Sequence, residues 1–142
     1  MTLVVDASVA LKWYLIEDGA ESARQILADG DTLVAPELVV AEVCNACWLA
    51  GRRGEISAAQ QGAIAADITR VFDRLEGLVP HASRAAAIAR GLDHPVYDCF
   101  YLALSEALDA PLVTGDGRLL ARVAGTPFAA RTRGLEGYTP RN

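Results

Sequence analysis

The fold is decided by the stretch Leu3-Val4-Val5-Asp6-Ala7-Ser8-Val9-Ala10-Leu11 near the start of the chain. Leu3 to Val5 form a short apolar run that predicts a strand ending at Asp6. Ser8 is a suitable N-terminal cap for a helix that we expect to extend through Leu15. The same order, a short apolar run followed by a helix, recurs along the chain. Strands separated by helices predict an α/β fold with a parallel sheet covered on both faces.

The remaining elements follow from apolar periodicity and from Gly and Pro breaks. Further strands are expected at 32–35, 77–80, 111–114 and 127–130, and helices at 20–28, 37–53, 57–75, 83–91, 96–108 and 118–123. Ligands of such a sheet bind beyond the carboxyl ends of the strands. Asp6 and Asp116 are both predicted to lie at that edge.

The composition predicts one globular domain, residues 1–142, with 52% hydrophobic and 22% charged residues. The three cysteines lie in apolar surroundings and the N-terminus shows no secretory leader, so we expect reduced thiols and a cytoplasmic location. Cys44 and Cys47 are interpreted as buried small side chains rather than a zinc or redox pair. No apolar run is long enough to span a membrane. The net charge of −5 argues weakly against a nucleic-acid partner.

Four acidic residues stand in apolar stretches where burial is expected: Asp6, Glu42, Asp98 and Asp116. Unpartnered carboxylates are costly to bury and repel one another, and a divalent cation would relieve both costs. Oxygen ligands favour Mg²⁺ or Mn²⁺, whereas the shortage of histidine argues against Zn²⁺. A carboxylate cluster that holds such ions is suited to hydrolysis of phosphodiester bonds.

Each aspartate also has an ordinary structural explanation. Asp6 could begin a turn, Asp98 could be the N-terminal cap of its helix, and Asp116 suits a Gly-Asp-Gly turn. Glu42 has no such explanation, because it is expected in the middle of an apolar helix.

Four segments carry a resemblance to a known family: Val5-Asp6-Ala7-Ser8, Glu42-Val43-Cys44-Asn45, Tyr97-Asp98-Cys99-Phe100-Tyr101-Leu102-Ala103-Leu104 and Leu112-Val113-Thr114-Gly115-Asp116-Gly117-Arg118-Leu119. In this order they resemble the PIN-domain ribonucleases, and more narrowly the VapC-type toxins of type II toxin–antitoxin systems. The resemblance covers nearly the whole chain. It implies a three-layer α/β/α sandwich, usually a homodimer, that cuts RNA such as transfer or ribosomal RNA and is silenced by a cognate antitoxin.

The resemblance also assigns roles to individual residues. It implies that Asp6, Glu42, Asp98 and Asp116 form an acidic pocket for Mg²⁺ or Mn²⁺. We expect the three aspartates to hold the metal, and Glu42 to hold a second ion or to orient the attacking water. Supporting polar groups are expected at Ser8, Asn45 and Thr114. Cleavage is expected to leave a 3′-hydroxyl and a 5′-phosphate.

Candidate RNA contacts are the arginines at 52, 53, 118 and 122, although solvent-facing charges at helix ends explain each of them as well. Lys12 is the only lysine, and neither its role nor that of the tail 131–142 follows from the sequence. Three alternative functions stay open: a housekeeping PIN-domain nuclease without an antitoxin, an inactive PIN-like scaffold, and a non-catalytic acidic Mg²⁺-binding signalling module. The signalling module usually needs a lysine near the final strands, whereas Lys12 lies in the first predicted helix.

Overall fold

A five-stranded parallel sheet forms the centre of the computed structural model, which describes residues 1–136. The strands are β1 (Thr2–Val5), β2 (Thr32–Pro36), β3 (Arg74–Glu76), β4 (Leu112–Thr114) and β5 (Thr132–Gly134). Their order across the sheet is β3-β2-β1-β4-β5, and every neighbouring pair is parallel. The order therefore reverses direction at β1, which pairs with both β2 and β4.

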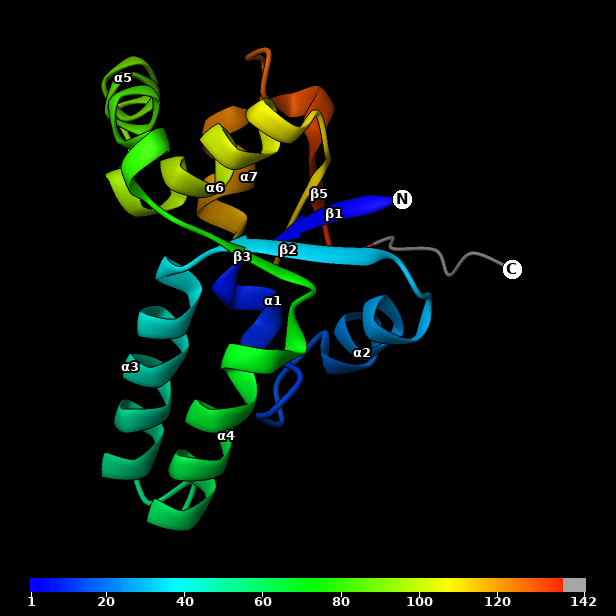
Figure 1. Cartoon of the computed structure of the whole chain (residues 1–142), viewed down its shortest axis with the longest axis vertical. Coiled ribbons are helices and arrows are strands. Elements are labelled where there is room, and N and C mark those ends of the chain that lie inside the picture. Colours follow the sequence, from blue (N-terminus) through cyan, green and yellow to red (C-terminus); the bar gives the residue numbers. More distant parts are fainter. Residues whose placement is uncertain (137–142) are drawn as a thin grey trace.

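Helices cover both faces of the sheet, which confirms the predicted three-layer α/β/α sandwich (Figure 1). Below the sheet in that view lie α1 (Ala7–Leu11), α2 (Ala20–Ala28), α3 (Leu38–Arg52) and α4 (Ala58–Val71); above it lie α5 (Ala82–Leu92), α6 (Val96–Leu108) and α7 (Gly117–Val123). Two short 3₁₀ helices, η1 (Val79–His81) and η2 (Ala129–Arg131), complete the set. Within residues 1–136, no helix is both long and apolar enough to cross a membrane.

The central strands are buried on both faces. Leu3, Val4 and Val5 of β1 and the three residues of β4 are buried, and so is most of the apolar face of α6. Full burial of one such aliphatic side chain contributes about 1.5–3 kcal/mol to stability. Strands covered on both faces appear in a sequence as continuous apolar runs, which is why the predicted positions of β1, β2 and β4 are confirmed.

The two edge strands lie elsewhere than predicted. Strand β3 precedes the segment 77–80, which instead leads into η1, and β5 follows the segment 127–130, which overlaps η2. Each edge strand pairs with a single neighbour, so neither needs the continuous apolar run on which the prediction relied. The sequence of β3, Arg-Leu-Glu, has one apolar residue only.

The first helix also begins differently from the prediction. Asp6, not Ser8, is the N-cap of α1, because its side chain accepts a hydrogen bond from the Val9 amide. The helix ends at Leu11 rather than Leu15. The predicted cap at Ser57 is confirmed, since Ser57 and Gln60 form a capping box at the start of α4.

Candidate active site

The four predicted acids come together at the carboxyl edge of the sheet. Asp6 directly follows β1 and Asp116 lies just after β4, and these two strands are neighbours. Glu42 belongs to α3, and Asp98 lies in the first turn of α6. All four line one pocket of about 200 Å³, which we call the acidic pocket; its other lining residues are Ala7, Ser8, Leu11 and Tyr101.

Asp6 is the most firmly held of the four. Its carboxyl group is buried, with 3% of the residue exposed. The hydroxyls of Ser8 and Thr114 donate to separate oxygens of Asp6, and the Val9 amide donates to Oδ1 at 3.3 Å. Burial raises the pKa of Asp6 from 3.8 to about 6, although the hydrogen bonds from both hydroxyls oppose that rise. The predicted supporting positions of Ser8 and Thr114 agree with this arrangement.

Glu42 is held by Tyr101, a residue to which the sequence analysis assigned no role in the site. The Tyr101 hydroxyl donates to Glu42 Oε1 at 2.7 Å, while the Tyr101 ring is fully buried. Burial raises the pKa of Glu42; the Tyr101 hydrogen bond lowers it, and the charge of Asp98 raises it further. One signal for Tyr101 was available, because it follows Asp98 by three residues and therefore lies near it on the α6 surface.

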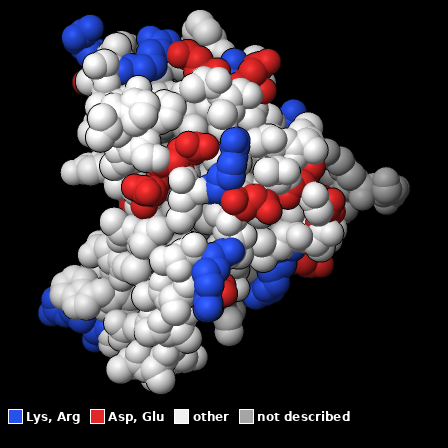
Figure 2. All heavy atoms as spheres, in the orientation of Figure 1, with Lys and Arg blue, Asp and Glu red and all other residues white. Residues whose placement is uncertain are grey.

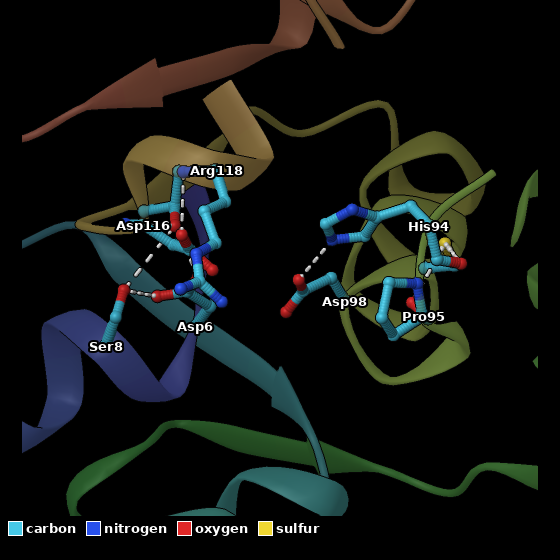
Figure 3. A network of polar contacts seen from close by, with 9 residues as sticks. Asp6, Ser8, His94, Pro95, Asp98, Asp116 and Arg118 are labelled. Atoms are coloured by element: carbon cyan, nitrogen blue, oxygen red, sulfur yellow. Dashed lines mark hydrogen bonds and ion pairs between the residues drawn. The ribbon is translucent and has the colours of Figure 1, made fainter. Parts of the chain in front are cut away.

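Asp98 is paired with a histidine that sequence reasoning missed. His94 Nε2 lies 2.5 Å from Asp98 Oδ2, and the two side chains are 10% and 23% exposed. Figure 3 shows the imidazole ring pointing at the carboxylate. The spacing of four residues between His94 and Asp98 is visible in the sequence and is a signal for this pair. The alternative that Asp98 caps α6 is wrong, because the N-cap residue is Pro95.

Asp116 combines a structural role with its place in the acidic pocket. Its Oδ1 accepts a hydrogen bond from the Arg118 amide at 2.9 Å and so caps α7. Its own amide donates to Thr114 Oγ1 at 3.0 Å, which joins it to the hydroxyl network around Asp6. Asp116 therefore has a structural role as a helix cap rather than as a turn residue, and its role in the site stays a prediction.

A larger pocket of about 710 Å³ adjoins the acidic pocket and shares Asp98 and Asp116 with it. We call it the arginine pocket, because Arg118 and Arg122 line it from one side of α7; its other lining residues are Asp93, His94, Pro95 and Ala121. In Figure 3 the Arg118 side chain extends from the start of α7 toward the space between Asp6 and Asp98. Cationic side chains thus lie at the edge of the acidic pocket.

Four of the predicted site residues line neither pocket. Thr114 is one of them, although its hydroxyl donates to Asp6. Asn45 is exposed on α3, whereas Glu42 is partly buried. Arg52 and Arg53 are exposed at the end of α3, and the Arg52 guanidinium lies 5.2 Å from the centre of the Trp48 ring. The three cysteines are free thiols, with Cys44 partly buried and the other two buried.

The surface charge near the sheet edge is mainly acidic. Figure 2 shows acidic side chains gathered where the outline of the molecule narrows between the upper and lower helices. A negative potential at that edge attracts cations, so a metal ion or a basic segment suits it better than bare polyanionic RNA.

The donor chemistry of the acidic pocket fits Mg²⁺ or Mn²⁺, because all of its candidate ligand atoms are oxygens. One oxygen each of Glu42, Asp98 and Asp116 accepts a hydrogen bond from the protein, which leaves the second oxygen of each for another partner. Within the described part of the chain, no three acidic, histidine or cysteine side chains stand close enough together to hold an ion.

Comparison with known proteins shows the same fold and related sequences. The family model described as the PIN domain matches residues 3–126. Ribonuclease VapC3 of Pyrobaculum aerophilum is 31% identical over 121 residues, which cover 84% of this chain and 92% of that protein. A crystal structure from the same organism aligns with a TM-score of 0.72 and 24% identity, covering 96% of this chain and 94% of the other. A toxin–antitoxin complex from Klebsiella pneumoniae aligns with a TM-score of 0.63 and 15% identity, covering 99% and 98%.

Proposed function

The chain belongs to the PIN-domain family, and we propose from this premise that it is a metal-dependent endoribonuclease. The observation that carries the proposal is the convergence of Asp6, Glu42, Asp98 and Asp116 from four separate elements in one pocket. The name of the similar VapC3 protein, a ribonuclease, supports RNA as the substrate.

We assign Mg²⁺ or Mn²⁺ to the acidic pocket, held by the three aspartates. When bound, such an ion lowers the pKa of a coordinated water and stabilises charge on the phosphate during in-line displacement. Ser8 and Thr114 keep the Asp6 carboxylate in place through their hydroxyls. Glu42, held by Tyr101, lies on the opposite wall and either orients the attacking water or binds a second ion.

The arginine pocket is the proposed path of the RNA strand into the site. Arg118 and Arg122 are one turn apart on α7, so both guanidinium groups can meet phosphates of the same strand. Their pocket shares Asp98 and Asp116 with the acidic pocket, so a phosphate held there would lie beside the carboxylates. Arg52 and Arg53 contribute to no pocket with the carboxylates, so their earlier assignment as RNA contacts receives no support from the structure.

We further propose that the protein is the toxin of a toxin–antitoxin pair and acts as a homodimer. The solved toxin–antitoxin complex with the same fold supports the antitoxin partner. The homodimer rests on the family resemblance alone. The acidic pocket suits a basic segment of an antitoxin, since an arginine or lysine there would occupy the place of the cation.

Cleavage of RNA by the purified protein tests the nuclease proposal. We expect cleavage with Mg²⁺ or Mn²⁺, none with EDTA, and recovery when the ion is restored. End-labelling of the products is expected to show 3′-hydroxyl and 5′-phosphate ends. Cleavage that persists in EDTA would contradict the metal assignment, and binding of Mg²⁺ without cleavage would favour the signalling module instead.

The position of Lys12 already weighs against the signalling module. Lys12 Nζ lies 3.2 Å from Glu17 Oε2, and the residue lines neither the acidic nor the arginine pocket. It lines a separate pocket with Gly115 and Gly117, and its ammonium group is paired with Glu17 rather than with an acid of the site.

Expression in living cells separates a toxin from a housekeeping nuclease. We expect growth arrest on expression of this chain, and relief when the product of the neighbouring open reading frame is expressed with it. Normal growth despite nuclease activity in the test tube would favour the housekeeping alternative.

A further inference from the structure

We propose that His94 is a positioning residue that fixes the Asp98 carboxylate, so that Asp98 offers one defined oxygen to the acidic pocket. The inference rests on the proposed function of that pocket as a metal site. It concerns a histidine that takes no part in the roles assigned above, and that lines the arginine pocket beside Arg118.

The backbone around His94 is held from both sides. The His94 amide donates to the Ala89 carbonyl at 3.1 Å, at the end of α5. Asp93, the C-cap of α5, adopts the left-handed conformation with φ of 51°, and Pro95 is the N-cap of α6. The Cys99 thiol donates to the Pro95 carbonyl at 3.5 Å. His94 therefore lies in a short junction between α5 and α6, and the hydrogen bonds of this junction restrain its backbone.

The direction of the hydrogen bond follows from the chemistry of the two groups. An ionised carboxylate can only accept hydrogen bonds, so Nε2 of His94 carries the proton and donates to Asp98 Oδ2. With Oδ2 engaged, Oδ1 is the oxygen of Asp98 left for a ligand. A carboxylate restrained in this way loses less freedom when it binds an ion than one that can rotate.

Glu42 and Asp116 resemble Asp98 in that a protein donor is bonded to one of their two carboxylate oxygens. Tyr101 holds Oε1 of Glu42, and the Arg118 amide holds Oδ1 of Asp116. His94 differs from these donors because its ring also forms part of the arginine pocket. It thus lies between the proposed RNA path and a proposed metal ligand, where a shift of the ring would change the position of Asp98.

Binding of Mn²⁺ to the RNA-free protein, measured by calorimetry, tests the role of His94 independently of cleavage. Replacement His94→Ala removes the donor and is expected to raise the dissociation constant for Mn²⁺ by about 10-fold, as for other outer-shell partners of metal ligands. The Mg²⁺ concentration for half-maximal RNA cleavage should rise in parallel. His94→Gln, whose amide nitrogen can replace Nε2 as the donor, should recover most of both losses.

His81 supplies a matched control, because it is the only other histidine of the chain and lines neither pocket. His81→Gln should leave Mn²⁺ binding and cleavage unchanged. A purely structural role of His94 predicts a lower unfolding temperature for His94→Ala with Mn²⁺ affinity within 2-fold of the original protein, and that result would overturn the inference.

The same measurements separate the inference from the proposed function. If the original protein binds Mn²⁺ but cleaves no RNA, the proposed nuclease function fails, while weaker Mn²⁺ binding by His94→Ala still supports the positioning role. If the original protein cleaves RNA but binds no Mn²⁺, the positioning role is overturned and the nuclease function stands without its metal.

Discussion

The two walls of the acidic pocket hold their carboxylates in different ways. On the sheet wall, Asp6 follows a buried strand and receives hydrogen bonds from two hydroxyls and an amide. On the helix wall, Glu42 and Asp98 each depend on one side-chain donor, Tyr101 or His94. The sheet wall is therefore part of the folded core, whereas the helix wall can be altered with little effect on the fold. Substitutions on the two walls should separate stability from chemistry.

Asp98→Asn should have the largest effect on activity. The amide oxygen can still accept from His94 Nε2, so the side chain keeps its position while the charge is lost. We expect RNA cleavage to fall on the order of 10³-fold, which corresponds to about 4 kcal/mol of transition-state stabilisation. Stability should stay the same or improve, because the charge of Asp98 contributes to the raised pKa values of Asp6 and Glu42.

Single-turnover cleavage assays and urea unfolding of the same preparation measure both effects. Full Mg²⁺-dependent activity of Asp98→Asn would exclude Asp98 from the site. If Asp98→Asn loses both activity and folding, Asp98 is needed for the fold as Asp6 is. The two walls would then not differ in their importance for stability.

Asp6 should make the stability of the ion-free protein depend on pH. Its pKa is about 6 in the folded state, against an ordinary value of 3.8, so between these values the folded state binds more protons than the unfolded state. Stability therefore falls as pH rises through this window, by about 3 kcal/mol in total.

The free energies of unfolding of the original protein and of Asp6→Asn, measured in EDTA from pH 4 to pH 7, isolate this contribution. We expect Asp6→Asn to be the more stable protein at pH 7, by up to about 3 kcal/mol, and the difference to shrink toward pH 4. A difference that does not change with pH would show that Asp6 titrates normally.

Thr114→Val tests the sheet wall. The valine cannot donate to the buried Asp6 carboxylate or accept from the Asp116 amide, so buried polar atoms lose their partners. We expect a loss of about 2 kcal/mol in the free energy of unfolding at neutral pH. Thr126→Val serves as a control, since Thr126 lies outside the site and its hydroxyl contacts only nearby backbone. If Thr114→Val lowers the free energy of unfolding by no more than Thr126→Val does, the hydrogen bonds of Thr114 to Asp6 and Asp116 do not stabilise the sheet wall.

Tyr101→Phe tests the helix wall and should have the smallest effect on stability. Glu42 is only partly buried, so water can replace the lost hydroxyl, and we expect a loss of about 1 kcal/mol or less. The pKa of Glu42 should rise further, because the Tyr101 hydrogen bond lowers it. The acidic limb of the pH–rate profile is then expected to move to higher pH. If Tyr101→Phe lowers the free energy of unfolding as much as Thr114→Val does, the helix wall contributes as much to stability as the sheet wall.

The parts of the structure that the sequence predicted are those with an unusual local signal. Strands β1, β2 and β4 are apolar on both faces, and the four acids stood out because they interrupt such stretches. Strand β3 carried no local signal in the sequence. It is defined by its hydrogen bonds to β2, and none of its three side chains is fully buried.

The partners of the acids were harder to predict. Tyr101 meets Glu42 across 59 positions of the chain. The contact forms only because α3 and α6, which cover opposite faces of the sheet, meet at the same edge of it. Asn45 was expected at the site from the family resemblance, but its side chain is exposed on α3. The His94 and Asp98 pair was within reach, since a spacing of four residues places two side chains on one helical face. Local spacing thus suggests candidates, and tertiary packing decides among them.

The central place of β1 in the sheet has a consequence for synthesis of the protein. Strand β1 comprises residues 2–5, but one of its two neighbours, β4, comprises residues 112–114. Chains fold as they emerge from the ribosome, and contacts between distant residues form late. A nascent chain that ends before β4 lacks one side of the sheet and Asp116 with it. The acidic pocket therefore first assembles after synthesis has passed Asp116, so a shorter nascent chain carries the Asp6 strand without the pocket that Asp6 lines.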